Sequence, residues 1–151
     1  MYLSEDKYKE IEKLVPLACL NIIIVDDEGR ILVMKRNNEP AKGLYWYPGG
    51  RIKRGQSLEE ALKEKIKEET GLEWQELEFI RVASVDSTLF KTRHTININF
   101  LLKKKTNSTI RLNPEHSDFK WVKPRDFDKE KLNPYLKWAI NGGWGAFTFN
   151  F

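Results

Sequence analysis

Hydrophobic and polar positions along this chain follow two different periods, which together predict strands interleaved with helices. An apolar run from Leu17 to Val25 is followed by the turn sequence Asp-Asp-Glu-Gly and by a second apolar stretch, a pattern typical of a β-hairpin. The aromatic segment 45–47 predicts a further strand, which the Pro-Gly-Gly sequence at 48–50 is expected to break. Before the hairpin, the segment from Ser4 to Leu14 predicts a helix capped by Ser4.

The second half of the chain returns to the strand pattern. Segments 77–89 and 94–101 are long and extended, and the second alternates apolar and polar residues. Successive side chains of a strand point to opposite faces. We therefore expect the apolar residues of the second segment to face the core, and Asn97 and Asn99 to face away from it.

A helix with clear end signals lies between these halves. Ser57, with Glu60 three residues later, forms a capping box, and Gly71 supplies the stop. A short strand at 118–122 and a closing helix at 134–140 complete the predicted elements. Strands interleaved with two or three helices favour an α/β fold, in which a mixed β-sheet is sandwiched between α-helices.

One face of the central helix combines apolar residues with a charge. At about 100° per residue, Glu69 falls on the same arc as the apolar side chains. An inward carboxylate costs several kcal/mol unless it is paired or bound to a metal. Lys65, one turn earlier, is one candidate partner, and a divalent cation is the other. The residues predicted to form the buried arc are Leu58, Ala61, Leu62 and Ile66.

The loop before the helix favours the cation. Gly49 and Gly50 allow the backbone to approach a ligand closely. Magnesium takes oxygen ligands and is often held by one or two carboxylates together with substrate phosphates. Basic side chains that could bind such phosphates surround the glycines, namely Lys35, Arg36, Arg51, Lys53 and Arg54.

Composition narrows the class of protein. A chain of 151 residues with 40% hydrophobic residues is the size of one domain, expected over 1–151. It shows neither a membrane-spanning run nor a secretory signal, so we expect a soluble, cytoplasmic protein. Cys19, the one cysteine, lies in an apolar run and is expected to be a small buried residue. The net charge of +4 would suit a polyanion, but a nucleic-acid recognition motif is missing.

The segment from Gly49 to Leu72 resembles the Nudix box. In that motif a glycine is followed after five residues by Glu and, after seven more, by Arg-Glu-aliphatic-x-Glu-Glu-x-Gly-aliphatic. The resemblance implies the Nudix fold and a Mg²⁺-dependent hydrolase that acts on nucleoside diphosphates linked to another group. The matching residues are Gly50, Ile66, Glu68, Glu69, Gly71 and Leu72, whereas Gln56, Glu64 and Lys65 depart from the motif.

Within this superfamily the chain is most similar to the GDP-mannose mannosyl hydrolases, from about residue 1 to residue 140. The segments MYLSEDKY, VPLACLNIIIV, KRNNEPAKGLYWYPGGRI, RHTININF and NPEHSDFKWV carry the similarity. By that resemblance, Arg36 and Arg51 would hold the diphosphate and His116 would be the general base. The implied substrate is a nucleotide sugar, GDP-mannose in the first place.

The same resemblance implies a magnesium site. Glu69, Glu115 and the carbonyl of Gly49 would be its ligands, with Glu68 as a further candidate and Mn²⁺ as a substitute ion. A typical Nudix enzyme has a glutamate at the position of Lys65, which helps to bind metals or to activate the water. Lysine can do neither, so we expect one Mg²⁺ and an attack by water on the anomeric carbon, within reach of a loop histidine.

Other departures bear on the substrate. The family generally has Asp at Asn21, Arg at Glu64 and, at Thr95, a Tyr that helps the diphosphate to leave. Asn21 and His94 are candidate substrate contacts. Two other functions stay open: a conventional Nudix pyrophosphohydrolase that cleaves the P–O–P bridge, and a non-catalytic nucleotide-binding domain whose box has decayed.

The aromatic tail, residues 143–151, lies beyond the resemblance. Phe147, Phe149 and Phe151 alternate with other residues, as in an edge strand. Aromatic side chains at a chain end usually find a partner surface. We expect the tail to pack on this domain or on a second subunit, and we favour a homodimer.

Overall fold

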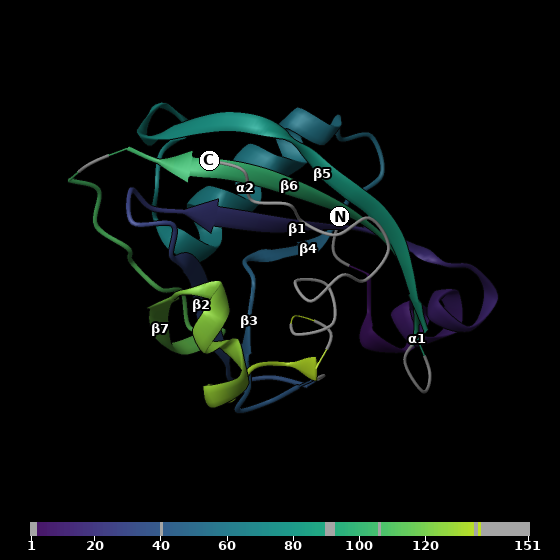
Figure 1. Ribbon diagram of the computed structural model, residues 1–151. Coiled ribbons are helices and arrows are strands. Elements are labelled where there is room, and N and C mark those ends of the chain that lie inside the picture. Colours follow the sequence, from purple (N-terminus) through teal and green to yellow (C-terminus); the bar gives the residue numbers. More distant parts are fainter. Residues whose placement is uncertain (1–2, 40, 90–92, 106, 135, 137–151) are drawn as a thin grey trace.

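A computed structural model describes residues 3–39, 41–89, 93–105, 107–134 and 136. One mixed sheet runs in the order β3-β2-β1-β6-β5, with β4 also paired to β1 and β7 to β2 (Figure 1). β1 and β6 are parallel, and the other paired strands are antiparallel. The strands are β1 Leu17–Val25, β2 Ile31–Arg36, β3 Tyr45–Trp46, β4 Gly49–Arg51, β5 Leu77–Leu89, β6 His94–Lys104 and β7 His116–Val122.

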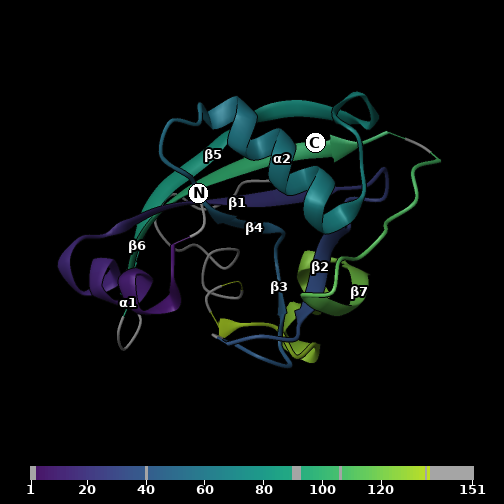
Figure 2. The ribbon, with the colours of Figure 1, turned by 180° about the vertical axis from the view of Figure 1, so that it is seen from behind.

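In the part of the chain that the structure describes, two α-helices and two short 3-10 helices accompany the sheet. α1 (Glu5–Leu14) lies near one end of β5 and β6, and α2 (Leu58–Thr70) crosses one face of the sheet (Figure 2). The predicted capping box of α2 is present, and Gly71 ends the helix at φ 70°. The 3-10 helices are η1 (Trp74–Glu76) and η2 (Pro124–Lys129). Among the described residues, no helix has both the length and the apolar character that a membrane crossing requires.

The central strand β1 is buried on both faces of the sheet. Leu20, Ile22 and Ile24 of β1 pack with the apolar face of α2. The alternate residues Ile23 and Val25 pack on the opposite side, in a second cluster that includes Phe127 of η2, Leu132 and Leu136. The α/β prediction, a mixed sheet flanked by helices, is therefore confirmed.

The central helix and the glycine segment differ locally from the sequence predictions. The 48–50 segment does not simply break the strand, because Gly49–Arg51 form β4 and pair with Cys19–Asn21. Leu58 is 45% exposed, since it is the first residue of α2, whereas Ala61, Leu62 and Ile66 are buried as predicted. Cys19 is only half-buried.

Ile98 and Phe100 of β6 face the core on the side of α2 as predicted, and the asparagines lie on the opposite face, but these asparagines are not exposed as a half-exposed strand requires. Asn97 and Asn99 are buried, and Ile96 is the more exposed residue. Burial of the asparagines is tolerated because Asn21 of β1 and Asp86 of β5 form hydrogen bonds with them. Most of the predicted closing helix at 134–140 lies outside the described residues, as does the tail at 143–151.

Candidate active site

Glu69, on the last turn of α2, is the buried charge that the helical pattern predicted. The residue is 5% exposed, and its Oε2 accepts a 3.0 Å hydrogen bond from the backbone N–H of Gly49. Burial raises the pKa of the Glu69 carboxyl to about 7; the Gly49 bond and the charge of Lys65 oppose this rise, and the charge of Glu115 adds to it. A bound cation would offset both the free-energy cost of burying this charge and its repulsion by Glu115.

The glycines of β4 allow this close approach. A Cβ atom on Gly49 would lie 2.3 Å from the carbonyl oxygen of Leu20, so no other residue fits there. A Cβ atom on Gly50 would lie 3.2 Å from Cε of Lys65, the flexible end of a side chain. Gly49 thus supplies both the donor to Glu69 and the space between β1 and α2.

The ammonium group of Lys65 places a permanent positive charge near Glu68 and Glu69. Its Nζ forms a 2.9 Å ion pair with Oε2 of Glu68, rather than a direct bond to Glu69. Burial acts to lower the pKa of Lys65, but the hydrogen bond and charge of Glu68, with a smaller contribution from the charge of Glu69, keep this pKa raised. Glu68 therefore already has a cationic partner in this arrangement, and Glu69 is the less committed carboxylate.

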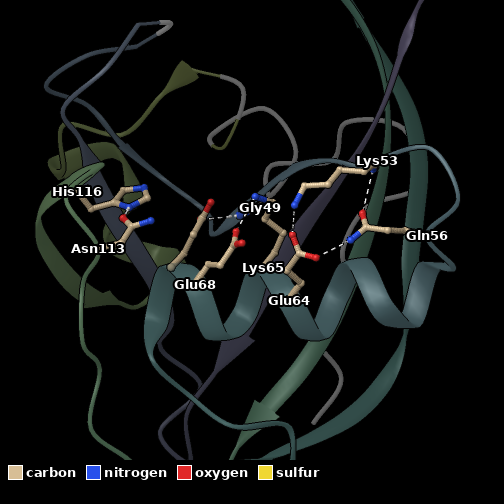
Figure 3. Close-up of polar contacts among 9 residues, drawn as sticks. Gly49, Lys53, Gln56, Glu64, Lys65, Glu68, Asn113 and His116 are labelled. Atoms are coloured by element: carbon tan, nitrogen blue, oxygen red, sulfur yellow. Dashed lines mark hydrogen bonds and ion pairs between the residues drawn. The ribbon is translucent and has the colours of Figure 1, made fainter. Parts of the chain in front are cut away.

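Two departures from the Nudix box form contacts with each other. Nε2 of Gln56 donates a 2.6 Å hydrogen bond to Oε2 of Glu64, and Lys53 forms an ion pair with the same carboxylate. Figure 3 shows Glu64, Lys65 and Glu68 extending from α2 toward the segment that carries Gly49 and Lys53. Glu64 thus fixes the glycine loop to the helix and is not an ordinary solvated residue of a charged face.

His116, the candidate general base, lies on the far side of Glu68 from Glu64 (Figure 3). His116, placed in a loop by the sequence prediction, is the first residue of β7, and its Cα pairs with that of Arg36 on β2. The neighbouring segment is fixed by a 2.9 Å hydrogen bond from the N–H of Asn37 to the carbonyl of Glu115. His116 is 7% exposed. Burial lowers the pKa of its imidazole, with a smaller effect in the same direction from Arg36 and an opposing effect from Glu115.

Asn113 determines which nitrogen of His116 carries the proton. Oδ1 of Asn113 lies 2.9 Å from Nδ1 of His116 and also accepts the backbone N–H of Glu115 at 3.2 Å. The oxygen of a side-chain amide has no proton to donate. Oδ1 of Asn113 therefore accepts a hydrogen bond from the imidazole as well. Nδ1 is therefore the donor, and Nε2 keeps the lone pair that a general base needs (Figure 3).

A cavity of about 100 Å³ lies beside Gly49 and Gly50. Arg36 and Arg93 both line it, as does Asn21. Arg51 does not line this cavity, because its guanidinium is stacked on the ring of Tyr8 in α1, 3.9 Å from the ring centroid. Of the predicted substrate contacts, the structure thus places Arg36 and Asn21 at the cavity.

His94 does not line this cavity, although its sequence neighbours Arg93 and Thr95 both do. It begins β6, and its Nε2 is 2.7 Å from Oγ of Ser87.

The donors around Glu69 fit a hard divalent cation with two protein carboxylates. Glu69 and Glu115 act on each other electrostatically, and Arg36 acts on both. Over the part of the chain that the structure describes, no group of three or more His, Cys, Asp or Glu side chains is placed to hold an ion. The feature of this site that a hard divalent cation would suit is the buried carboxyl of Glu69, with Glu115 near enough to act on it.

Comparison with known proteins places the chain in a family. The profile described as "NUDIX domain" matches residues 16–139, and the chain belongs to this family. An ADP-ribose pyrophosphatase of Methanocaldococcus jannaschii is 47% identical over 49 residues, 32% of this chain and 29% of that protein. The low-salt glycan biosynthesis protein Agl8 of Haloferax volcanii is 34% identical over 71 residues, 47% of this chain and 45% of that protein. These matches span less than half of either relative.

Solved structures agree on the fold. The crystal structure of a MutT protein from Methanosarcina mazei Go1 superimposes with a TM-score of 0.71 at 23% identity, and covers 82% of this chain and 90% of that one. At this identity the likeness concerns the arrangement of the strands and helices alone.

Three residues of the site escaped the sequence analysis. Asn113 orients His116, Arg93 lines the cavity, and Tyr8 holds Arg51. Asn113 had a signal, since it stands three residues before His116 in the sequence Asn-Pro-Glu-His. Arg93 and Tyr8 gave none, because only tertiary packing brings Arg93 to the cavity and Tyr8 against Arg51.

Proposed function

We propose that this protein is a Mg²⁺-dependent hydrolase of nucleoside diphosphate sugars, with GDP-mannose as substrate and water attack on the anomeric carbon. One observation carries the proposal. His116 is held by Asn113 with the lone pair on Nε2, whereas the helix position expected for an activating carboxylate is occupied by Lys65, which is paired with Glu68.

The chemistry follows from this arrangement. A water molecule bound at Nε2 of His116 gives up its proton to that nitrogen as its oxygen forms the bond to the anomeric carbon. The bond from that carbon to the diphosphate oxygen breaks, and its electron pair stays on the departing nucleoside diphosphate. Arg36, whose field already reaches His116 and Glu69, stabilises the charge that develops on this leaving group.

Mg²⁺ would be held by Glu69 and Glu115, with the carbonyl of Gly49 as a further oxygen, and it would neutralise charge on the two phosphates. Lys65 remains a fixed cation beside Glu68 and reduces the need for a second ion. Burial raises the pKa of the Glu69 carboxyl, and a cation that stabilised the charged form would offset this effect, which supports the assignment. Mn²⁺ is the expected substitute.

The relatives support the substrate class. ADP-ribose is itself a nucleoside diphosphate joined to a sugar, and a protein named for its hydrolysis shares 47% identity with this chain over 49 residues. The glycan biosynthesis protein adds a link to sugar metabolism.

The second candidate function is a conventional pyrophosphohydrolase, which the name of the first relative favours. In that reaction water attacks phosphorus and the P–O–P bridge breaks. Glu68 is 42% exposed on its side chain and would have to act as the base after leaving Lys65. A nucleotide-binding domain without catalysis would need neither His116 nor its lone pair.

Product analysis tests the proposal. The protein is incubated with GDP-mannose and Mg²⁺, and products are followed by ³¹P and ¹H NMR, with other nucleotide sugars as a panel. The expected products are GDP and mannose whose anomeric configuration is inverted at release. GMP and mannose 1-phosphate would establish the pyrophosphohydrolase instead. Absence of turnover on the whole panel would leave the binding domain.

A further inference from the structure

Polar side chains on three adjacent strands form one connected network behind the cavity. Asn21 on β1 lies beside Asn99 on β6 in the parallel register, and Asp86 on β5 lies opposite Asn97 on β6. All point to the face of the sheet away from α2, since the alternate residues of β1 pack against that helix. The three asparagines are between 1% and 7% exposed, so their orientation is set by the protein.

One carboxylate fixes the direction of the network. Oδ1 of Asp86 accepts a 2.9 Å hydrogen bond from Nδ2 of Asn97, and Oδ2 accepts a 2.6 Å bond from Nδ2 of Asn99. An ionised carboxylate can only accept, so both amide nitrogens must face Asp86. Bonds to a charged acceptor are stronger than neutral ones, which makes this orientation firm.

The orientation of the Asn99 amide in turn determines that of Asn21. Because the nitrogen of Asn99 faces Asp86, its Oδ1 is turned the other way, where it accepts a 2.9 Å bond from Nδ2 of Asn21. The amide nitrogen of Asn21 is therefore held toward Asn99, with the oxygen on the other side. Asn21 and Asn97 both line the cavity that also contains Arg36 and Arg93.

The geometry points to a recognition wall for sugar hydroxyls, in which Asp86 is the positioning residue that fixes Asn21 and Asn97. This inference rests on the proposed function and deepens it. Sugar hydroxyls both donate and accept, so amides of fixed polarity can pair with them, and a site built for such hydroxyls rejects ligands that lack them. The two arginines of the same cavity suit the attached phosphates.

The wall is next to the site of reaction. Asn21 pairs across β1 and β4 with Gly49, whose N–H binds Glu69. A group recognised there lies beside the phosphate that Arg36 would hold, which is the position of a sugar joined directly to the diphosphate. The terminal sugar and the ribose of the nucleotide share this chemistry, and binding measurements separate them.

Calorimetric titration of Asp86→Asn with GDP-mannose, GDP and pyrophosphate, each with Mg²⁺, tests the inference. An amide at position 86 replaces one of the two acceptor oxygens by an NH2 donor, so the bonds that Asn97 and Asn99 make to separate oxygens cannot both persist in this arrangement. The matched control is Asp118→Asn, since Asp118 also accepts a side-chain hydrogen bond, from Tyr45, but outside this cavity. Asn99→Leu is the second variant, because it keeps the branched shape of the side chain and removes the hydrogen bond to Asn21.

Affinity for GDP-mannose should fall on the order of tenfold or more in both network variants, while pyrophosphate binding stays unchanged. Retained GDP binding would assign the wall to the terminal sugar, and an equal loss on GDP would assign it to the ribose. Unchanged affinity for GDP-mannose, or an equal loss for pyrophosphate, would overturn the inference and leave the proposed function intact. Absence of GDP-mannose binding by the wild-type protein would overturn both.

The relay has a signature without any ligand. The ¹⁵N side-chain amide signal of Asn21 should shift in Asp86→Asn, although the hydrogen bonds of Asp86 given above come from Asn97 and Asn99. The same signal should be unaffected in Asp118→Asn. An Asn21 signal that is insensitive to Asp86 would show that no orientation is transmitted and would reject the positioning role.

Discussion

Burial of the Glu69 carboxyl in the candidate site affects the stability of the folded protein. Its pKa of about 7 lies above the ordinary value of 4.5, because burial disfavours the charged form. Proton binding therefore stabilises the folded state. This contribution is fully present below pH 4.5 and is lost as the pH rises through about 7. The metal-free protein should thus carry an ionised, buried carboxylate at pH 8.

The substitution Glu69→Gln should remove this destabilising buried charge. At pH 8 in EDTA the variant should be more stable to unfolding than the wild type, by at most about 3 kcal/mol, whereas near pH 5 the difference should nearly vanish. Chemical denaturation at the two pH values measures this.

The same substitution should weaken Mg²⁺ binding, although it stabilises the metal-free protein. Titration calorimetry with nucleotide present should show a severe loss in Glu69→Gln and little change in Glu60→Gln, whose side chain is exposed on the first turn of α2. Equal effects of the two substitutions would contradict the assignment of Glu69 to the ion.

His116 and Asn113 predict a pH dependence. Burial lowers the pKa of the imidazole below its usual 6.5, so His116 stays a base at neutral pH, and kcat/KM should fall only as the pH drops through that lowered value. His116→Asn should reduce kcat on the order of 100-fold or more.

Asn113→Asp provides the sharper comparison. The carboxylate keeps the acceptor for Nδ1 but favours the imidazolium, so the acidic limb of the pH profile should move to higher pH. An unchanged profile in Asn113→Asp would mean that this hydrogen bond does not orient the base.

At the scale of elements, β4 and the C-terminal turn of α2 must approach one another, and two adjacent glycines differ in what they tolerate. Gly49→Ala should prevent stable folding or abolish nucleotide binding, since its Cβ would meet the Leu20 carbonyl at 2.3 Å. Gly50→Ala should cost less because its Cβ meets only the flexible end of Lys65. Thermal melts of the two variants compare them, and equal losses would mean that backbone dihedral strain, rather than this contact, decides.

Most elements could be predicted from the sequence because their signals are local. The capping box of α2 and the turn between β1 and β2 depend on residues a few positions apart. The buried position of Glu69 followed from helical periodicity alone. The strand at Gly49–Arg51 could not be predicted, because it forms only by pairing with a distant strand.

The asparagines of β6 show where periodicity fails. Alternation reveals that Asn97 and Asn99 share a face, but not whether another layer covers it. The partner that makes burial acceptable, Asp86, comes from a different strand. For the same reason the orientation of His116 and the place of Arg93 needed the tertiary structure.

For the whole molecule, the aromatic tail provides the prediction on assembly. Residues 143–151 lie outside the described part of the chain, and their alternating phenylalanines still predict a partner surface. A chain ending at Gly143 should have a lower melting temperature and, if the tail joins two subunits, half the sedimentation mass. Unchanged mass and unchanged melting temperature would count against a packing role for the tail.

The whole molecule also determines which bond breaks, because α2 supplies Lys65 at one end of the site and β7 supplies His116 at the other. Hydrolysis of GDP-mannose with Mg²⁺ in ¹⁸O-labelled water, followed by mass analysis, tests this most directly. Attack on the anomeric carbon predicts unlabelled GDP and labelled mannose. Label in GDP, GMP or mannose 1-phosphate would place the attack at phosphorus and contradict the assignment of His116 as the base for glycosyl hydrolysis.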